Sequence, residues 1–261
     1  MGMIVVPYHQ DERLSDGYIP LPLADDLQVV DPELPDGDIW RRLAALDDAA
    51  ADEIAASVSA GGPTTVLSGD CLIGMAVLAG AQRAGVHPGI VWFDAHGDVH
   101  TLDTTTSGYL GGLALRLLLG AHPDLLARPL GLHPVAEDRT VLVDARDLDP
   151  PEAEYLRTSA IRRSGVADLD VASLPDGPLI VHVDVDVTDP DDLPALLFPA
   201  PGGPPAAQVI AAVHRILETG RVTALDIACP WQPTTQDSVQ QGRSDLLRQL
   251  ISGYEAPSQS T

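Results

Sequence analysis

Short runs of apolar and β-branched residues alternate along the chain with longer segments that are rich in Ala and Leu. The short runs predict strands at residues 3–8, 64–69, 89–95, 140–145, 178–187 and 222–228. The longer segments predict helices at residues 39–59, 72–84, 110–119, 151–157, 206–218 and 237–253. Because the strands lack an alternating polar face, we expect an α/β fold whose parallel sheet is covered by helices on both sides.

Neither a repeat nor a change in composition divides the chain into separate parts. The Pro- and Gly-rich stretch at residues 198–205 lies within the alternation of strands and helices, so we interpret it as a loop and not as a linker. The sequence therefore predicts one domain over residues 1–255. The small and polar residues 256–261 are expected to form a disordered tail.

The charge of the chain excludes several classes of partner. Its 15 basic residues, all of them Arg, stand against 38 acidic ones, which gives a formal net charge of -23 at pH 7. Such a charge repels nucleic acids and anionic lipid surfaces, so neither is an expected partner. The N-terminal residues do not resemble a signal peptide, the apolar stretches are too short to span a membrane, and two cysteines are too few for a disulfide scaffold. We expect a cytoplasmic protein.

Two clusters of Asp and His residues follow apolar strands. The first supplies three potential metal ligands at alternate positions: Asp94, His96 and Asp98. The second places Asp184 and Asp186 at the end of another strand, with His182 two residues deeper on the same face. Since α/β sheets bind ligands at the carboxyl ends of their strands, we expect the two clusters to converge there.

Metal binding is the favoured explanation for so many carboxylates in one place. Unpaired carboxylates that are packed closely repel one another and stay partly protonated, whereas divalent cations neutralise and coordinate them. Aspartate oxygens with one imidazole suit Mn(II) or a similar ion, and carboxylates that bridge the clusters would suit a pair of ions. The alternative is that these aspartates only stabilise turns at the ends of strands.

These motifs resemble those of the arginase family, the ureohydrolases that include arginase, agmatinase and formimidoylglutamase. The family motifs are GGDHS, DAHxD, SxDxDxxDP and PGG. The corresponding segments here are SGDC at residues 68–71, DAHGD at 94–98, HVDVDVTDP at 182–190 and PGG at 201–203. The resemblance implies that the predicted domain is a catalytic, three-layer α/β/α domain with a central parallel sheet. It also implies two Mn(II) ions that activate water for attack on a guanidinium or amidine carbon.

The resemblance also implies a role for each residue of the clusters. Asp94 and Asp184 would bridge the two ions, and His96 and Asp186 would complete one site. Asp98 would help to complete the other site and would accept or relay a proton from the attacking water. Beyond a small-molecule substrate, the family implies one further partner, a second copy of the chain in a homo-oligomer.

Cys71 stands where the family motif has a His that binds the first metal ion. A thiolate can also coordinate the ion, and because it is softer than an imidazole, it would favour Zn, Fe or Co. Alternatively, Cys71 is an inert buried thiol that leaves one site weak. A Cys at this position resembles the members of the family that act on Nω-hydroxy-L-arginine.

The segments that bind the amino acid end of the substrate are partly kept. In HTLDTTTSGYLGG, Thr105 and Ser107 match residues that contact the α-carboxylate of the substrate in arginase, while His100 replaces an Asn. In ARDLDPPE, Asp149 matches the residue that binds the α-ammonium group. For Asp149, the alternative is that it only caps a helix.

Two departures concern the reacting end of the substrate. Gly111 replaces the His that serves the family as a proton shuttle, so that water, Cys229 or a rotated His100 could supply the proton. Cys229 also replaces a Glu that pairs with the substrate guanidinium, a charge-assisted bond typically worth about 1.5–3 kcal/mol. N-hydroxylation lowers the basicity of a guanidine, so Nω-hydroxy-L-arginine should tolerate this loss better than arginine.

The favoured hypothesis is therefore an Mn-dependent amidinohydrolase that converts Nω-hydroxy-L-arginine to L-ornithine and hydroxyurea. Arginase, agmatinase-like and formimidoylglutamase-like activities are the alternatives within the family. A catalytically silent, metal-binding regulatory protein is the alternative of another class, because two reactive positions have changed. A deacetylase-like amide hydrolase is a third alternative, since a shared fold does not fix the substrate.

Overall fold

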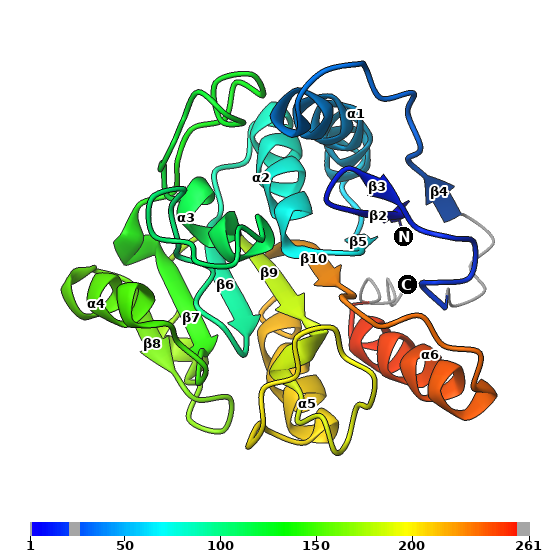
Figure 1. The fold of residues 1–261 in the computed structure, drawn as a ribbon. Helices are drawn as coiled ribbons and strands as arrows, with labels where there is room; N and C mark the ends of the chain where they lie inside the picture. The colour runs from blue at the N-terminus through cyan, green and yellow to red at the C-terminus, as the bar shows by residue number, and fades with distance from the viewer. Residues whose placement is uncertain (1, 21–26, 255–261) are drawn as a thin grey trace, which may run out of the picture.

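The six predicted strands form the centre of an eight-stranded sheet in the computed structural model, which describes residues 2–20 and 27–254 (Figure 1). The strand order is β4-β1-β5-β10-β9-β6-β7-β8, and every pair is parallel. The strands are β1 (Gly2–Val6), β4 (Leu27–Val29), β5 (Thr64–Ser68), β6 (Gly89–Asp94), β7 (Thr140–Asp144), β8 (Arg162–Ser164), β9 (Leu179–Asp184) and β10 (Val222–Ala228). The predicted tail at residues 256–261 lies outside the described residues, as do residues 1 and 255.

Helices cover both faces of the sheet, which confirms the three-layer α/β/α architecture (Figure 1). The helices are α1 (Ile39–Ser59), α2 (Gly74–Arg83), α3 (Ala114–Leu118), α4 (Pro150–Thr158), α5 (Ala206–Leu217) and α6 (Asp237–Ser252). The first four contribute to one apolar core, and α5 and α6 contribute to the other. Neighbouring strand residues alternate between the two cores, as Val66 and Leu67 do in β5. Within the described ranges, no helix is both long and apolar enough to cross a lipid bilayer.

Two of the predicted helices are shorter than expected. The segment predicted at 72–84 opens with a 3-10 turn (η1, Cys71–Ile73), because the side chain of Asp70 accepts a hydrogen bond from the N–H of Leu72 at 2.8 Å. The segment predicted at 110–119 likewise opens with a 3-10 turn (η2, Gly111–Leu113). Consecutive glycines disfavour α-helix there, so α3 is left with a single turn or so of regular helix.

The strand predicted at 178–187 is too long, and the correction affects the second acidic cluster. β9 ends at Asp184, whose side chain accepts a hydrogen bond from the N–H of Asp186 at 2.8 Å. This bond turns the chain into a short 3-10 helix (η5, Val185–Val187), so Asp186 does not share a strand face with Asp184.

Four short strands were not predicted. β4 and β8 are the outermost strands of the sheet and have only three residues each, most of them exposed, so they carry no apolar run. The other two, β2 (Tyr8–His9) and β3 (Glu12–Arg13), form a small hairpin of two residues a side. Edge strands and hairpins of this size depend on neighbouring chain segments more than on their own sequence.

Candidate metal centre and active site

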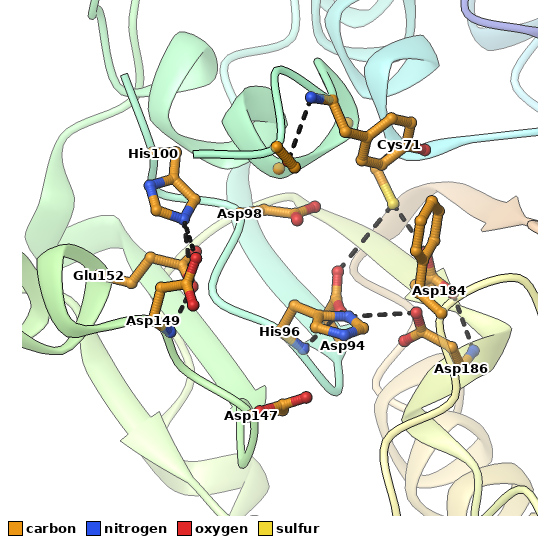
Figure 2. Close-up of a pocket in the computed structure, with 15 residues that line it drawn as sticks. Cys71, Asp94, His96, Asp98, His100, Asp147, Asp149, Glu152, Asp184 and Asp186 are labelled. Atoms are coloured by element: carbon orange, nitrogen blue, oxygen red, sulfur yellow. Dashed lines mark hydrogen bonds and ion pairs between the residues drawn. The ribbon is translucent and has the colours of Figure 1, made fainter. Parts of the chain in front are cut away.

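The carboxyl ends of β5, β6 and β9 bring three potential metal ligands together. Asp94 is the last residue of β6, Asp184 is the last of β9, and Cys71 begins the turn after β5. β6 and β9 are neighbours, and only β10 lies between β9 and β5. Cys71 Sγ is consequently 2.9 Å from Asp184 Oδ2 and 4.0 Å from Asp94 Oδ2 (Figure 2).

Two similar turns orient the aspartates. Asp94 Oδ1 accepts the N–H of His96 at 2.7 Å, and Asp184 Oδ1 accepts the N–H of Asp186 at 2.8 Å. The turn-stabilising role therefore uses Oδ1 of each aspartate and leaves Oδ2 of both on the side of Cys71. His96 Nδ1 lies 3.3 Å from Asp94 Oδ1 and 3.2 Å from Asp186 Oδ2, so the two turns also contact each other.

Asp98 lies in the same cavity, held by an unusual backbone conformation. Its φ of 52° is in the left-handed region, which non-glycine residues rarely adopt, although Asp tolerates it better than most. The carbonyl of Asp98 accepts a hydrogen bond from the N–H of Arg116 at 2.9 Å. Its Oδ2 is buried and has no hydrogen-bond partner among the described residues. Strained backbone of this kind is often kept where a side chain must be aimed at a site.

Among the described residues, two sets of three place one ligand atom each within 4.8 Å of one another. The first set is Cys71, Asp94 and His182, and the second is Asp94, His96 and Asp186. Asp94 belongs to both sets, which is the position of a carboxylate that bridges two ions. All six predicted metal ligands line the same cavity: Cys71, Asp94, His96, Asp98, Asp184 and Asp186.

The cluster is electrostatically costly by itself. Burial and the charges of neighbouring carboxylates raise the pKa of Asp98 and of Asp184 well above the usual range. Burial and the charge of Asp94 raise the pKa of Asp186 to about 6. Burial alone would lower the pKa of His96, but the carboxylates of Asp186 and Asp94 raise it to about 12. Each of these groups therefore holds its proton more tightly than it would in water.

The donor set fits divalent metal ions. Buried polar atoms without a partner are rare in proteins, yet Asp98 Oδ2 and His182 Nε2 are both in that condition among the described residues. A divalent cation would supply a partner for such atoms and would offset the repulsion between the carboxylates. Carboxylate and imidazole ligands suit Mn(II), whereas the thiol of Cys71 introduces a preference for softer ions.

The cavity beside these ligands has a volume of about 220 Å³ and a second polar wall. His100 Nε2 lies 3.1 Å from Asp149 Oδ2 and 3.8 Å from Glu152 Oε2. Figure 2 shows these three residues on one side of Asp98 and Cys71, Asp94, His96 and Asp186 on the other. Ser107 also lines the cavity. The arrangement offers polar and acidic contacts for a small molecule at a distance from the ligand sets.

Two residues predicted to contact substrate do not line this cavity. Thr105 is absent from its lining, and its hydroxyl accepts the N–H of Gly108 at 3.1 Å. Cys229 is fully buried behind the cavity, where its N–H donates to the carbonyl of Ser68 at 2.9 Å. Burial, together with the charges of Asp184 and Asp226, raises the pKa of the Cys229 thiol well above its usual range. Cys229 is therefore a neutral group near physiological pH.

Asp149 also has the structural role that was the alternative for it. It is the N-cap residue of α4, and its own N–H donates to Glu152 Oε2 at 3.1 Å. Helix capping fixes the backbone of Asp149 but still leaves its Oδ2 in contact with His100 in the cavity wall. The two roles are therefore compatible.

Tyr109 lines the cavity and was missed in the sequence. A Cβ atom on Gly111 would lie 2.4 Å from Tyr109 Cε1 and 2.5 Å from its hydroxyl oxygen, so the ring occupies the space that a side chain at 111 would need. The ring also packs on Phe198, with ring centroids 4.6 Å apart. An aromatic residue two positions before an unexpected Gly was the available signal. Phe198, Asp147, Glu152 and Gly112 also line the cavity and were likewise not predicted.

The tyrosine hydroxyl is suited to donate a hydrogen bond. Burial raises the pKa of Tyr109 well above its usual range, and the charges of Asp70, Cys71, Asp184 and Asp98 act in the same direction. The phenol consequently stays protonated over the physiological pH range.

Comparison with known proteins places this geometry in a family. Residues 12–239 match the sequence profile described as "Arginase family". The chain is 33% identical over 192 residues to an arginase of Eremothecium gossypii, an alignment that covers 67% of this chain and 48% of that protein. It is 28% identical over 197 residues to the Nω-hydroxy-L-arginine amidinohydrolase of Streptomyces lavendulae, which covers 74% of this chain and 70% of the relative.

A solved structure shares the fold over nearly the whole chain. The arginase of Bacillus cereus superposes with a TM-score of 0.81 at 22% identity, covering 99% of both chains. In the sequence alignments, by contrast, the chain spans only about half the length of the Eremothecium arginase.

Proposed function

The chain belongs to the arginase family, and on this premise we propose that it is a metal-dependent amidinohydrolase, which hydrolyses a C–N bond of a guanidino compound. The observation that carries the proposal is Asp94, a buried carboxylate shared by two sets of ligands at the wall of a cavity. Cations bound there, which we propose to be two Mn(II) ions per chain, would lower the pKa of water and stabilise the negative charge on its oxygen as it attacks the guanidino carbon.

The substrate class that we propose is a guanidino amino acid. The wall formed by His100, Asp149 and Ser107 stands apart from the ligand sets, so it can hold the amino acid end of a substrate while the guanidino carbon reaches the metal centre. The carboxylate of Asp149 would bind the α-ammonium group, and the hydroxyl of Ser107 would bind the α-carboxylate. Fixing both groups would orient the reacting carbon.

Within this class we propose Nω-hydroxy-L-arginine, with L-arginine as the second candidate. A neutral Cys229 provides no negative charge for a full guanidinium, which supports a less basic hydroxyguanidine. The similarity to arginases supports arginine to the same degree as the similarity to the Streptomyces enzyme supports its hydroxylated form.

The chain's own residues would move the protons. Once cations offset the charges of its neighbours, Asp98 would be ionised, and its Oδ2, which is buried and has no partner among the described residues, would take a proton from the attacking water. The bond between that carbon and the substrate's δ-nitrogen then breaks, and this nitrogen takes up the proton as the amine of L-ornithine. Water and Nω-hydroxy-L-arginine give L-ornithine and hydroxyurea, so atoms and charge balance.

An assay of L-ornithine formation tests the function and its substrate. We expect the chain reconstituted with Mn(II) to release L-ornithine from Nω-hydroxy-L-arginine with a higher kcat/KM than from L-arginine. Both substrates give the same amino acid, so one detection method serves for both. A higher kcat/KM with L-arginine would instead establish arginase activity. Absence of turnover on a panel of guanidino and amidino compounds would contradict an enzymatic role and favour a silent, metal-binding protein.

The Tyr109 hydroxyl lines the cavity and stays protonated, so it would donate a hydrogen bond to the substrate as it reacts. A charge-assisted hydrogen bond is worth roughly 1.5–3 kcal/mol, so we expect Tyr109→Phe to lower kcat by about 10- to 100-fold. The substitution removes only a hydroxyl oxygen from the cavity wall, so metal content and thermal stability should stay unchanged. Tyr254→Phe is the matched control, since its hydroxyl bonds the carbonyl of Val222 at the opposite end of β10. Equal kcat for Tyr109→Phe and the parent protein would show that the hydroxyl has no part in the reaction.

A further inference from the structure

His182 is a fully buried histidine that lies between two side chains of the neighbouring strands. It lies on β9, paired in register with Asp226 of β10 on one side and with Trp92 of β6 on the other. His182 Nδ1 is 2.7 Å from Asp226 Oδ2, and the imidazole stacks on the Trp92 ring with centroids 3.5 Å apart. These contacts fix the ring in one orientation.

The remaining ring nitrogen, Nε2, is buried and makes no hydrogen bond with any of the described residues. The contact with Asp226 occupies Nδ1, so Nε2 is the nitrogen that is left for another partner. Buried nitrogens without a partner are rare in proteins, so Nε2 is suited to bind a cation. One ring nitrogen of His182 lies within 4.8 Å of Cys71 Sγ and of an Asp94 oxygen, and Nε2 is the one that Asp226 leaves free.

We propose that His182 is a ligand of one metal ion together with Cys71 and Asp94, and that Asp226 positions its imidazole. Histidines that bind metals almost always donate their second ring N–H to a carboxylate or carbonyl, and Asp226 holds that place here. His182 stands where the family motif SxDxDxxDP has Ser, and Cys71 stands where the family has His. The imidazole of this site thus comes from a strand and not from the turn after β5.

This ligand set makes the two ion positions chemically unequal. A thiolate and an imidazole favour a softer ion such as Zn(II) or Co(II), whereas Asp94, His96 and Asp186 offer mainly oxygen and suit Mn(II). On binding, Cys71 releases its thiol proton to solvent and its sulfur bonds the cation, while Nε2 donates its lone pair without losing a proton. The position that contains Cys71 and His182 should therefore take Co(II) or Zn(II) first.

Titration of the chelator-treated full chain with Co(II) tests the assignment. The first equivalent should produce a thiolate-to-Co(II) charge-transfer band, and His182→Ser should weaken the binding of that equivalent by at least about 100-fold. Asp226→Asn should weaken it by about 10- to 100-fold, because the ring loses its charged partner. His87→Ser, which changes an exposed histidine far from the cluster, is the matched control and should titrate like the parent protein.

A rescue variant keeps the test decisive if removal of His182 also disturbs folding. Cys71→His with His182→Ser offers the imidazole from the turn after β5, so it should bind the first Co(II) tightly again but without the thiolate band. Circular dichroism of the metal-free proteins compares their folding. The proposal is overturned if folded His182→Ser binds Co(II) with the affinity and spectrum of the parent. A second measurement starts from the protein loaded with Zn(II) at both positions and adds Mn(II). The proposal is also overturned if Mn(II) displaces Zn(II) equally from both positions.

The inference rests on the proposed metal centre but not on the proposed substrate. Its readouts are affinity and absorption, so they are obtained whether or not any guanidino compound is turned over. A chain that binds Co(II) as described and hydrolyses nothing would contradict the proposed function alone. A chain that is active with Mn(II) and binds Co(II) independently of His182 would contradict this inference alone.

Discussion

Asp94→Asn is expected to remove both metal ions and to lower kcat/KM by at least about 1,000-fold, or roughly 4 kcal/mol in transition-state stabilisation. The reason is that Asp94 is the ligand common to both sets, so its charge supports each position. The amide is nearly isosteric and can still accept the N–H of His96, which limits the damage to the turn. Metal content by elemental analysis and steady-state kinetics measure the two effects.

Asp147→Asn is the matched control for this substitution. Asp147 lines the same cavity but belongs to neither ligand set, so its amide variant should keep the metal content of the parent protein. Burial raises the pKa of Asp94, but the hydrogen bonds and charge of His96 lower it by more, so the metal-free Asp94→Asn protein should be somewhat less stable than the metal-free parent. Full metal content and unchanged kinetics in Asp94→Asn would contradict the assignment of the centre.

Arg146→Ala should lower the free energy of unfolding by about 3 kcal/mol, a fall of roughly 6–12 °C in Tm. The guanidinium pairs with Asp144 and donates to four backbone carbonyls in two loops. The shortest of these bonds with a carbonyl is 2.6 Å, to Ala200, and another reaches the carbonyl of Asp186 at 3.3 Å. Loss of the guanidinium leaves several carbonyl oxygens unpaired and frees the turn that contains Asp186, a predicted metal ligand.

The same contact explains the PGG motif. A Cβ atom on Gly203 would lie 2.6 Å from Arg146 Nη2 and 2.9 Å from the carbonyl oxygen of Val187, so only glycine lets this loop close over the guanidinium. Thermal unfolding of the metal-free chain measures the effect of Arg146→Ala. Arg139→Ala is the control, since Arg139 also bonds two loop carbonyls but in an exposed place. If the two variants lose equal stability, the bonds of Arg146 with the loop carbonyls contribute no more to stability than those of an exposed arginine.

The sequence predicted the interior of the fold well because the central strands are buried on both faces. Each of the six predicted strands is found in the sheet, and helix α1 has the predicted limits. The errors lie where local hydrogen bonds override the apolar pattern, as at Asp184, whose side chain ends β9 three residues early. They also lie at β4 and β8, whose few exposed residues carry no pattern.

In the candidate site, too, the sequence predicted some residues correctly and missed or misplaced others. Asp94 and Asp184 stand at the ends of long apolar runs, so their meeting at one edge follows from the parallel sheet. The ring of Tyr109 fills the space next to Gly111. The apolar periodicity of the sequence could not predict this contact, because it depends on the conformation of a loop. Thr105 matches a motif by position, but the loop turns its hydroxyl toward the N–H of Gly108.

By itself, the sequence determined the architecture and the chemical class of the centre. Apolar periodicity sets which segments are strands and helices, and the Asp- and His-rich motifs carry the charges that a metal site requires. The tertiary structure decided which polar atoms have no hydrogen-bond partner and can bind a metal ion or a substrate. His182 and Asp226 are 44 residues apart, and the pairing of β9 with β10 brings them together and leaves Nε2 as the nitrogen without a partner among the described residues. Hydrogen-bond satisfaction depends on all neighbours in space, whereas a sequence pattern reports only neighbours along the chain.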